Sequence, residues 1–194
     1  MNSKEKIIRA ATDLISENPD CPEEITIREI SKRANVGVGL INYHFETKEK
    51  LIETCVQNII NGIVAKFSEI SALTKNDPSF ERLDRLGNMT LSYLFDHRAV
   101  SKISELSDMN SPSINDNTQR TLEAYIPLVT ACRPDWDEKK IRLKTFELIS
   151  CMQLSFLRHD VLRQTDGIDL TDPCERRKYH TQMLKSILEM TNEV

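Results

Sequence analysis

Apolar residues recur with the period of an α-helix along almost the whole of this 194-residue chain. The clearest case is residues 3–17, where one stripe collects Ile7, Ile8, Ala11, Leu14 and Ile15. No segment sustains the alternation of apolar and polar residues that marks a half-buried β-strand. Because helices and strands need different periods, the sequence predicts an all-α fold.

Proline, glycine and clusters of Asn, Ser and Asp separate the periodic segments. Two prolines in residues 18–22 end the first helix. Thr26 and Glu29 then have the spacing of a capping box that starts a short second helix. A third helix is expected from about 37 to 45. The remaining helices are expected at 47–71, 79–96, 98–108, 114–132, 136–164 and 172–191.

Three helices are expected before the long helix at 47–71, and five are expected after it. We therefore divide the chain into a three-helix head, residues 1–47, and a larger helical body, residues 48–194. The helix at 47–71 links the two, and at ~1.5 Å per residue it spans roughly 35 Å.

The formal net charge is −4, from 26 Lys and Arg against 30 Asp and Glu. This balance excludes a uniformly basic surface, so any contact with nucleic acid must come from a local patch. No run of ~18 apolar residues occurs, and no membrane partner is expected. The five cysteines, including Cys21, are widely spaced without a C-x-x-C pair, which indicates reduced thiols in a cytoplasmic protein.

The segment from Thr26 to Phe45 has the layout of a helix-turn-helix, two short helices joined by a tight turn. The residues expected to face inward are Ile27, Ile30, Ala34, Val36, Ile41 and Phe45. Gly37 is expected to supply the backbone freedom of the turn. The outward face of the third helix is expected to hold Gly39, Leu40, Asn42 and Tyr43. An exposed helical face of this kind fits the major groove of DNA, which is about 12 Å wide.

The distribution of charge along the chain also indicates that the head contacts DNA. Residues 25–50 carry a net charge of +2, whereas the other 168 residues carry −6. The sign suits contact with phosphates by the head alone. An ordinary helical hairpin shows a similar pattern, however, so the layout alone leaves a helical interaction module open.

Three stretches resemble the TetR family of bacterial transcriptional regulators: TIREISKRANVG at residues 26–37, INYHF at 41–45 and TKEKL at 47–51. The apolar stripe of residues 3–17 also resembles the first helix of that family. The rest of the chain is similar only in length, helical character and its paired C-terminal helices. The resemblance implies a sequence-specific DNA-binding regulator, a homodimeric repressor that binds a palindromic double-stranded operator. It also implies release by a small-molecule effector of unknown identity.

The resemblance further implies roles for individual residues. Phosphate contacts are implied for Thr26, Tyr43, His44 and Lys48, and base-facing positions for Arg28, Val38, Gly39, Leu40 and Asn42. Without the resemblance, Tyr43 and His44 would be interpreted as caps of the small core.

The chain departs from the family pattern at two positions. Gly37 stands where Ser or Thr commonly caps the recognition helix, and Asn42 stands where Tyr is common. The amide of Asn42 matches the adenine edge in the major groove. Since Val38 and Leu40 make the reading surface largely apolar, we expect contacts to thymine methyl groups. Asn42 and Arg28 are then the main residues expected to form hydrogen bonds with base edges.

The C-terminal helices at 136–164 and 172–191 carry long apolar runs. Such a pair suits a four-helix interface between two copies of the chain, although completion of a monomeric core would give the same pattern. The candidate lining of an effector pocket in the body is Met89, Tyr93, Phe95, Phe146, Met152 and Phe156. Aromatic and Met side chains at helical spacing also suit a plain core.

The pair His159-Asp160 leaves a metal-dependent α-helical enzyme as an alternative. The four histidines share no spacing typical of metal ligands, and no phosphate-binding loop or nucleophile motif occurs. We therefore expect no catalytic residues, no metal site and no cofactor, and we predict that the protein is not an enzyme.

Overall fold

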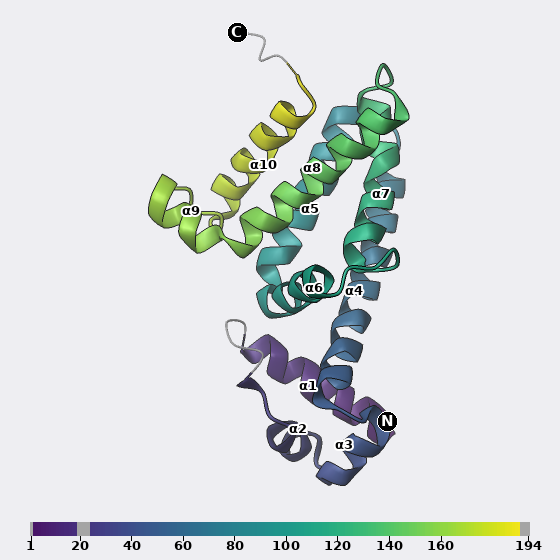
Figure 1. Cartoon of the computed structure of the whole chain (residues 1–194), viewed down its shortest axis with the longest axis vertical. Coiled ribbons are helices and arrows are strands. Elements are labelled where there is room, and N and C mark those ends of the chain that lie inside the picture. The colour runs from purple at the N-terminus through teal and green to yellow at the C-terminus, as the bar shows by residue number, and fades with distance from the viewer. Residues whose placement is uncertain (1, 19–23, 191–194) are drawn as a thin grey trace. The chain divides into compact units, whose positions relative to one another are not determined.

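The computed structural model describes residues 2–18 and 24–190, without the side chains of 63–66 (Figure 1). Cys21, both prolines of the segment 18–22 and the last residue of the predicted helix 172–191 lie outside the described residues. In the described part of the chain the structure consists of ten α-helices and no strand, which confirms the predicted all-α fold. None of its helices is long and apolar enough to cross a membrane.

The helices follow the predicted order with small shifts at their ends. Their bounds are α1 Ser3–Glu17, α2 Ile27–Ala34, α3 Val38–Phe45, α4 Lys48–Leu73, α5 Ser79–Asp96, α6 Arg98–Asn110, α7 Asn117–Cys132, α8 Glu138–Leu157, α9 His159–Asp166 and α10 Pro173–Ile187.

One predicted helix is wrong. The single helix expected at 136–164 is two helices, because α8 ends at Leu157 and α9 begins at His159. Arg158 between them leaves the helical conformation, with φ −112° and ψ 16°. The ring nitrogen Nδ1 of His159 bonds the carbonyl oxygen of Phe156 at 2.7 Å, and the two rings stack.

The chain forms two compact units. The head unit holds Met1–Lys66 and His97–Ser104, and the body unit holds Phe67–Asp96 and Glu105–Val194. The head unit is thus larger than the predicted head of residues 1–47. Two helices, α4 and α6, contribute residues to both units.

The head unit has its own core. Helices α1, α2 and α3 pack against one another in pairs. The fully buried side chains at the centre include Ile7, Ile15, Ile30, Ile41 and Leu51. From α6, Ala99 and Val100 join the same cluster. Burial of this apolar surface fixes which faces of α2 and α3 remain exposed.

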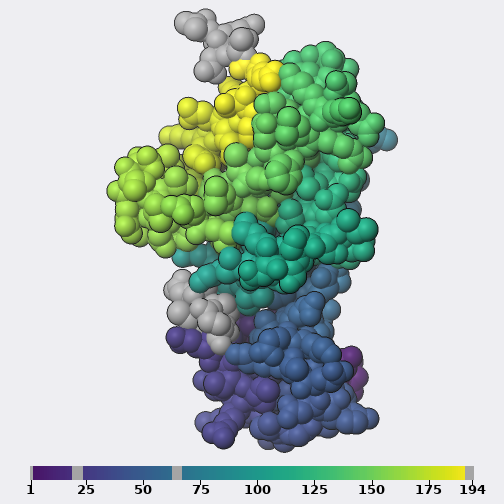
Figure 2. All heavy atoms as spheres, viewed as in Figure 1, coloured from purple at the N-terminus to yellow at the C-terminus, as the bar shows by residue number. Residues whose placement is uncertain are grey.

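The body unit is a bundle in which α5 packs against α7, α8 and α10, and α8 packs against α7 and α10. Leu83, Leu86, Leu91 and Leu148 lie at the centre of its core without solvent exposure. Helices α8 and α10 both reach the surface of this unit (Figure 2).

Candidate nucleic-acid interface

Helix α2 starts with the predicted capping box. The backbone N–H of Glu29 donates to Oγ1 of Thr26 at 3.2 Å, and the N–H of Thr26 donates to Oε2 of Glu29 at 2.7 Å. The hydroxyl of Thr26 also donates to Oε2 of Glu29, at 2.7 Å. This bond and the bond from the Thr26 N–H favour the ionised carboxylate, so the pKa of Glu29 lies below its usual value. Two backbone donors that the helix leaves unpaired are thereby satisfied, which fixes where α2 begins.

The turn between α2 and α3 is made by Asn35, and the role predicted for Gly37 is wrong. Asn35 takes the left-handed conformation, with φ 52° and ψ 52°, which Asn tolerates better than most residues. Gly37 has an ordinary extended backbone with φ −72° and caps α3 without a side-chain hydrogen bond. The hydroxyl of Ser31 donates to the carbonyl oxygen of Val36 at 2.6 Å and closes the turn.

Helix α3 buries one face and exposes the other, as its sequence predicts. Ile41 and Phe45, one turn apart, are 1% and 5% exposed. On the opposite face Tyr43 is 80% exposed, which excludes the reading of Tyr43 as a cap of the core. The other outward residues are Val38, Gly39 and Asn42, which are exposed, and Leu40 and His44, which are half-buried. Most of this outward surface of α3 is therefore accessible in the part of the head that the structure describes.

A tight reversal joins α3 to α4. Glu46 has φ 63° and ψ −54°, and the N–H of Thr47 donates to the carbonyl oxygen of Phe45 at 2.7 Å. This is a γ-turn with positive φ, a strained conformation for a residue with a side chain. It places Lys48 at the start of α4, where its ammonium donates to the carbonyl oxygen of Ile25 at 2.9 Å. The side chain of Lys48 therefore connects the first turn of α4 to the segment just before α2.

The cations of the head differ in their availability. Arg33 makes a two-pronged ion pair with Glu17, with N–O distances of 2.9 and 2.7 Å, so its charge is already paired within the head. Arg28 and Lys32 are exposed and make no ion pair within the described residues. Arg28 lies in the first turn of α2, and Thr26 caps the same helix.

Comparison with known proteins supports the interpretation of this geometry. Residues 7–55 match the family model for bacterial regulatory proteins of the tetR family. The HTH-type transcriptional repressor Rv3405c of Mycobacterium tuberculosis is 26% identical over 185 residues, which cover 94% of this chain and 87% of that protein. The probable HTH-type transcriptional regulator YttP of Bacillus subtilis is 28% identical over 102 residues. That match spans 53% of this chain and about half, 48%, of the length of YttP.

The fold agrees over the full length. A crystal structure of a transcriptional regulator from Rhodococcus sp. Rha1 superposes with a TM-score of 0.71, at 19% identity and with 100% of both chains covered. The head of the chain, at residues 7–55, resembles the TetR family. The protein is a DNA-binding transcriptional regulator with a helix-turn-helix in its head. TetR-family regulators bind DNA and small-molecule ligands and act as dimers.

In the body unit, the residues predicted to line a pocket differ in how far they are buried. Phe95, Met152 and Phe156 are buried in the core, and Met89 and Tyr93 are half-buried. Phe146 is 55% exposed, which contradicts its place in an internal pocket. Phe146 lies on α8, which is apolar on most of its sides. The sequence alone therefore did not show which side of α8 faces out.

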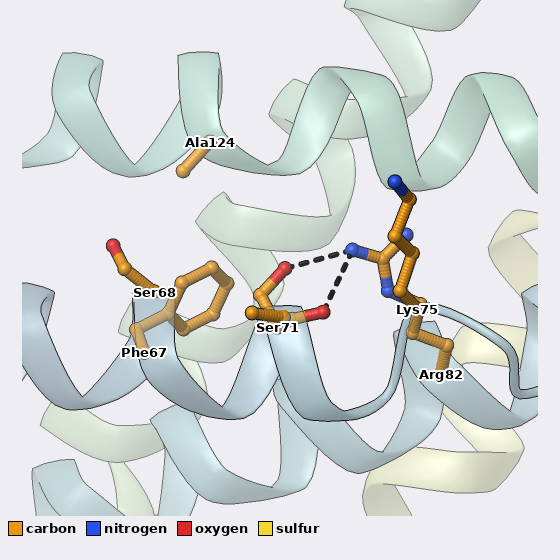
Figure 3. Close-up of a pocket in the computed structure, with 7 residues that line it drawn as sticks. Phe67, Ser68, Ser71, Lys75, Arg82 and Ala124 are labelled. Carbon is orange, nitrogen blue, oxygen red and sulfur yellow. Dashed lines mark hydrogen bonds between the residues drawn. The ribbon is translucent and has the colours of Figure 1, made fainter.

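The structure instead shows a cavity that the sequence did not predict. It has a volume of about 420 Å³ and lies between the end of α4, the start of α5 and the middle of α7 (Figure 3). Its lining includes Phe67, Ser71, Lys75 and Arg82. The residues come from three helices and a turn, so no local sequence pattern brings them together.

The His159-Asp160 pair has no further metal-ligating side chain beside it in the described ranges. His159 Nε2 lies 3.6 Å from the Asp160 carboxylate, and its Nδ1 bonds the backbone. Among the described residues no group of three His, Cys, Asp or Glu side chains could hold a metal ion. The described cysteines, Cys55, Cys132, Cys151 and Cys174, are free thiols.

Proposed function

We propose that this transcriptional regulator is a repressor that binds a palindromic operator as a homodimer and leaves it when a small molecule binds the body. The exposed outer face of α3, beside a mildly basic head, is the observation that carries the proposal. The protein would act by binding alone, without a catalytic step. Since the proposed target is chromosomal DNA, its place of action would be the cytoplasm.

The outer face of α3 would read base edges in the major groove. Val38 and Leu40 offer methyl groups that suit the C5-methyl of thymine, and the amide of Asn42 suits the N6 and N7 edge of adenine. Gly39 lets the helix backbone approach closely, since no side chain projects there. Arg28, on α2, would reach a base edge from the side. Together these groups favour an operator half-site rich in A·T pairs.

A second set of groups would hold phosphates. These are Thr26, Tyr43, His44 and Lys48, from the start of α2, the end of α3 and the start of α4. A lysine at a helix N-terminus opposes the helix dipole, and a phosphate there would offset this repulsion. Its bond to Ile25 already directs the Lys48 ammonium to the edge of the head. Contacts of this kind position the protein without reading sequence.

The homodimer would form through α8 and α10. On α8 the apolar residues Leu143, Phe146 and Leu154 are 55%, 55% and 53% exposed. At helical spacing they form one outward stripe, and exposed apolar patches of this kind mark interaction surfaces. A two-fold axis through this stripe would present α3 twice, which is why the operator should be a palindrome.

Release by an effector requires that the ligand bind a DNA-incompetent arrangement of the heads more tightly than the competent one. Helix α4 is the connection for this change, because it starts in the head unit and ends in the body unit. DNA fixes half-sites about 34 Å apart, or at multiples of that spacing. A change at the body end of α4 that altered the spacing of the two heads would therefore lower operator affinity.

The test is binding of the full chain to labelled DNA from upstream of its own gene, followed by fluorescence anisotropy. We expect a palindromic fragment to bind and Asn42→Ala to weaken it by about tenfold, because one bidentate base contact contributes ~1–3 kcal/mol. Binding to random DNA should change little. The control is Asn58→Ala, which removes an exposed amide from α4. If Asn42→Ala and Asn58→Ala bind the operator equally well, α3 does not read it through Asn42.

A further inference from the structure

The body cavity has a charged end and an apolar end. At one end lie the nitrogen-bearing tips of Lys75 and Arg82, and at the other lie Phe67, Ser68 and Ala124 (Figure 3). Ser71 stands between the two ends. Ligand cavities in proteins typically measure ~300–1,000 Å³ and combine apolar walls with a few fixed polar groups. The volume of about 420 Å³ falls inside this range.

Among the residues that the structure describes, the two cations at the charged end have no carboxylate partner. Neither Lys75 nor Arg82 makes an ion pair within the described part of the chain. Arg82 donates from a single nitrogen, Nη2, to the carbonyl oxygen and the hydroxyl of Ser71, at 3.1 and 2.8 Å. Its Nε is buried without a hydrogen-bond partner. A half-buried guanidinium next to an ammonium repels it, and an anion placed between them would remove the repulsion.

We propose that this cavity binds an anion with a short apolar chain. A carboxylate or phosphate headgroup would lie between Lys75 and Arg82 and accept hydrogen bonds from both. The planar fork of an arginine suits both headgroups, and the lysine adds a point charge. The apolar chain would run past Ser71 along Phe67 and Ala124. In taking this anion as the effector, the inference rests on the proposed function.

The position of the cavity allows anion binding to affect α4. Phe67, Ser68 and Ser71 are in the last two turns of α4, the helix that begins in the head unit. Arg82, at the start of α5, holds the end of α4 through its bonds to Ser71. An anion that draws the guanidinium away from Ser71 would loosen this connection. The same binding event would therefore change how the body holds α4.

The experiment is isothermal titration of the full chain with octanoate, octyl phosphate and the neutral analogue 1-octanol. Octanoate and octyl phosphate have alkyl chains that differ by about one methylene and headgroups of different shape and charge, so their comparison shows mainly which headgroup the site prefers. We expect both anions to bind more tightly than 1-octanol. Lys75→Gln and Arg82→Gln should each weaken octanoate by about tenfold, as expected for the loss of one charge-assisted hydrogen bond. Binding of 1-octanol should change little.

The matched control is Lys139→Gln, which removes an exposed charge from the first turn of α8, outside the cavity. A second variant, Ala124→Leu, fills the apolar end and should weaken all three compounds. Arg82→Gln also removes the bonds to Ser71, so its melting temperature is measured first. If Arg82→Gln fails to fold, Lys75→Gln decides the result, because Lys75 is exposed in the turn after α4.

Three results would overturn the inference: no binding of either anion at millimolar concentration, equal binding of octanoate and 1-octanol, or octanoate binding unchanged in Lys75→Gln. Operator release is measured separately by adding octanoate to the DNA complex. Specific anion binding without release supports the cavity as an anion site and contradicts its role as the effector site. Release by another compound that is insensitive to Lys75→Gln contradicts the role of this cavity as the effector site and leaves the proposed ligand-released repressor in place.

Discussion

Among single residues, Glu105 on α6 has an unusual environment. Burial, together with the negative charge of Asp108, raises the pKa of Glu105 to about 8, although a hydrogen bond from Gln153 opposes the rise. Asp116 adds further repulsion. One of its carboxylate oxygens is buried without a hydrogen-bond partner in the described residues. The folded body therefore favours the neutral acid at this position.

This environment predicts that the protein becomes less stable as the pH rises. Between the usual value of 4.5 and about 8, the folded chain keeps a proton on Glu105 that the unfolded chain releases. The free energy of unfolding should therefore fall from about pH 5 to about pH 8, by on the order of 1 kcal/mol per pH unit. Glu105→Gln, which is neutral at every pH, should remove most of this slope. Urea unfolding at several pH values measures it.

The control for that measurement is Glu69→Gln, which changes an exposed carboxylate on α4. The free energy of unfolding of Glu69→Gln should change with pH as that of the unchanged chain does. A Glu105→Gln variant with the same slope as the unchanged chain would show that Glu105 is ionised in the folded state.

Between elements, α5 and α10 approach each other closely at Gly87. A Cβ atom at this position would lie 2.2 Å from Nε2 and 2.5 Å from Cε1 of His180. The His180 ring is fully buried, and its Nδ1 donates to the Asp84 carboxylate at 3.1 Å. The hydroxyl of Thr181 donates to the same oxygen at 2.8 Å. The ring thus has neither the space nor the freedom to move aside.

We therefore expect Gly87→Ala to lower the free energy of unfolding by about 2 kcal/mol, as overpacking of a core does. Gly62→Ala is the matched control, because a Cβ there meets nothing within 4 Å. In a helix interior that change should stabilise by up to about 1 kcal/mol. Chemical denaturation of both variants gives the comparison. Similar stabilities would mean that α5 and α10 are not packed tightly at His180.

The elements that the sequence predicted well depend on neighbours along the chain. The capping box needs only Thr26 and Glu29, which are three residues apart, and the buried face of α3 follows from Ile41 and Phe45. The turn was placed correctly, but its left-handed residue is Asn35 rather than Gly37. Asn and Gly both adopt the left-handed conformation more readily than other residues. The sequence analysis chose Gly because it lacks a side chain that restricts φ.

The features that the sequence did not predict depend on distant partners. No Pro or Gly precedes the break after Leu157, where the His159 ring bonds Phe156 and packs on Phe95 from α5. In a helix that is apolar on most sides, only the neighbouring helices decide that Met152 is buried and Phe146 exposed. The cavity at Lys75 and Arg82 likewise exists only once α4, α5 and α7 are packed.

For the whole molecule, the proposed dimer connects the C-terminal helices to the DNA. A single head offers one recognition helix, which contacts only one half-site. A second head held at fixed spacing makes the second contact effectively intramolecular. Operator affinity should therefore depend on residues of α8 that never touch DNA.

Phe146→Asp tests this dependence, because it places a charge at the centre of the exposed stripe formed with Leu143 and Leu154. We expect a folded monomer by light scattering at micromolar concentration, and operator affinity lower by roughly 10²-fold or more. Ile114→Asp, at a site 86% exposed in the loop before α7, should stay dimeric and bind normally. A dimeric Phe146→Asp variant would place the interface elsewhere. A monomeric variant with full operator affinity would contradict the palindrome, since one recognition helix would then suffice.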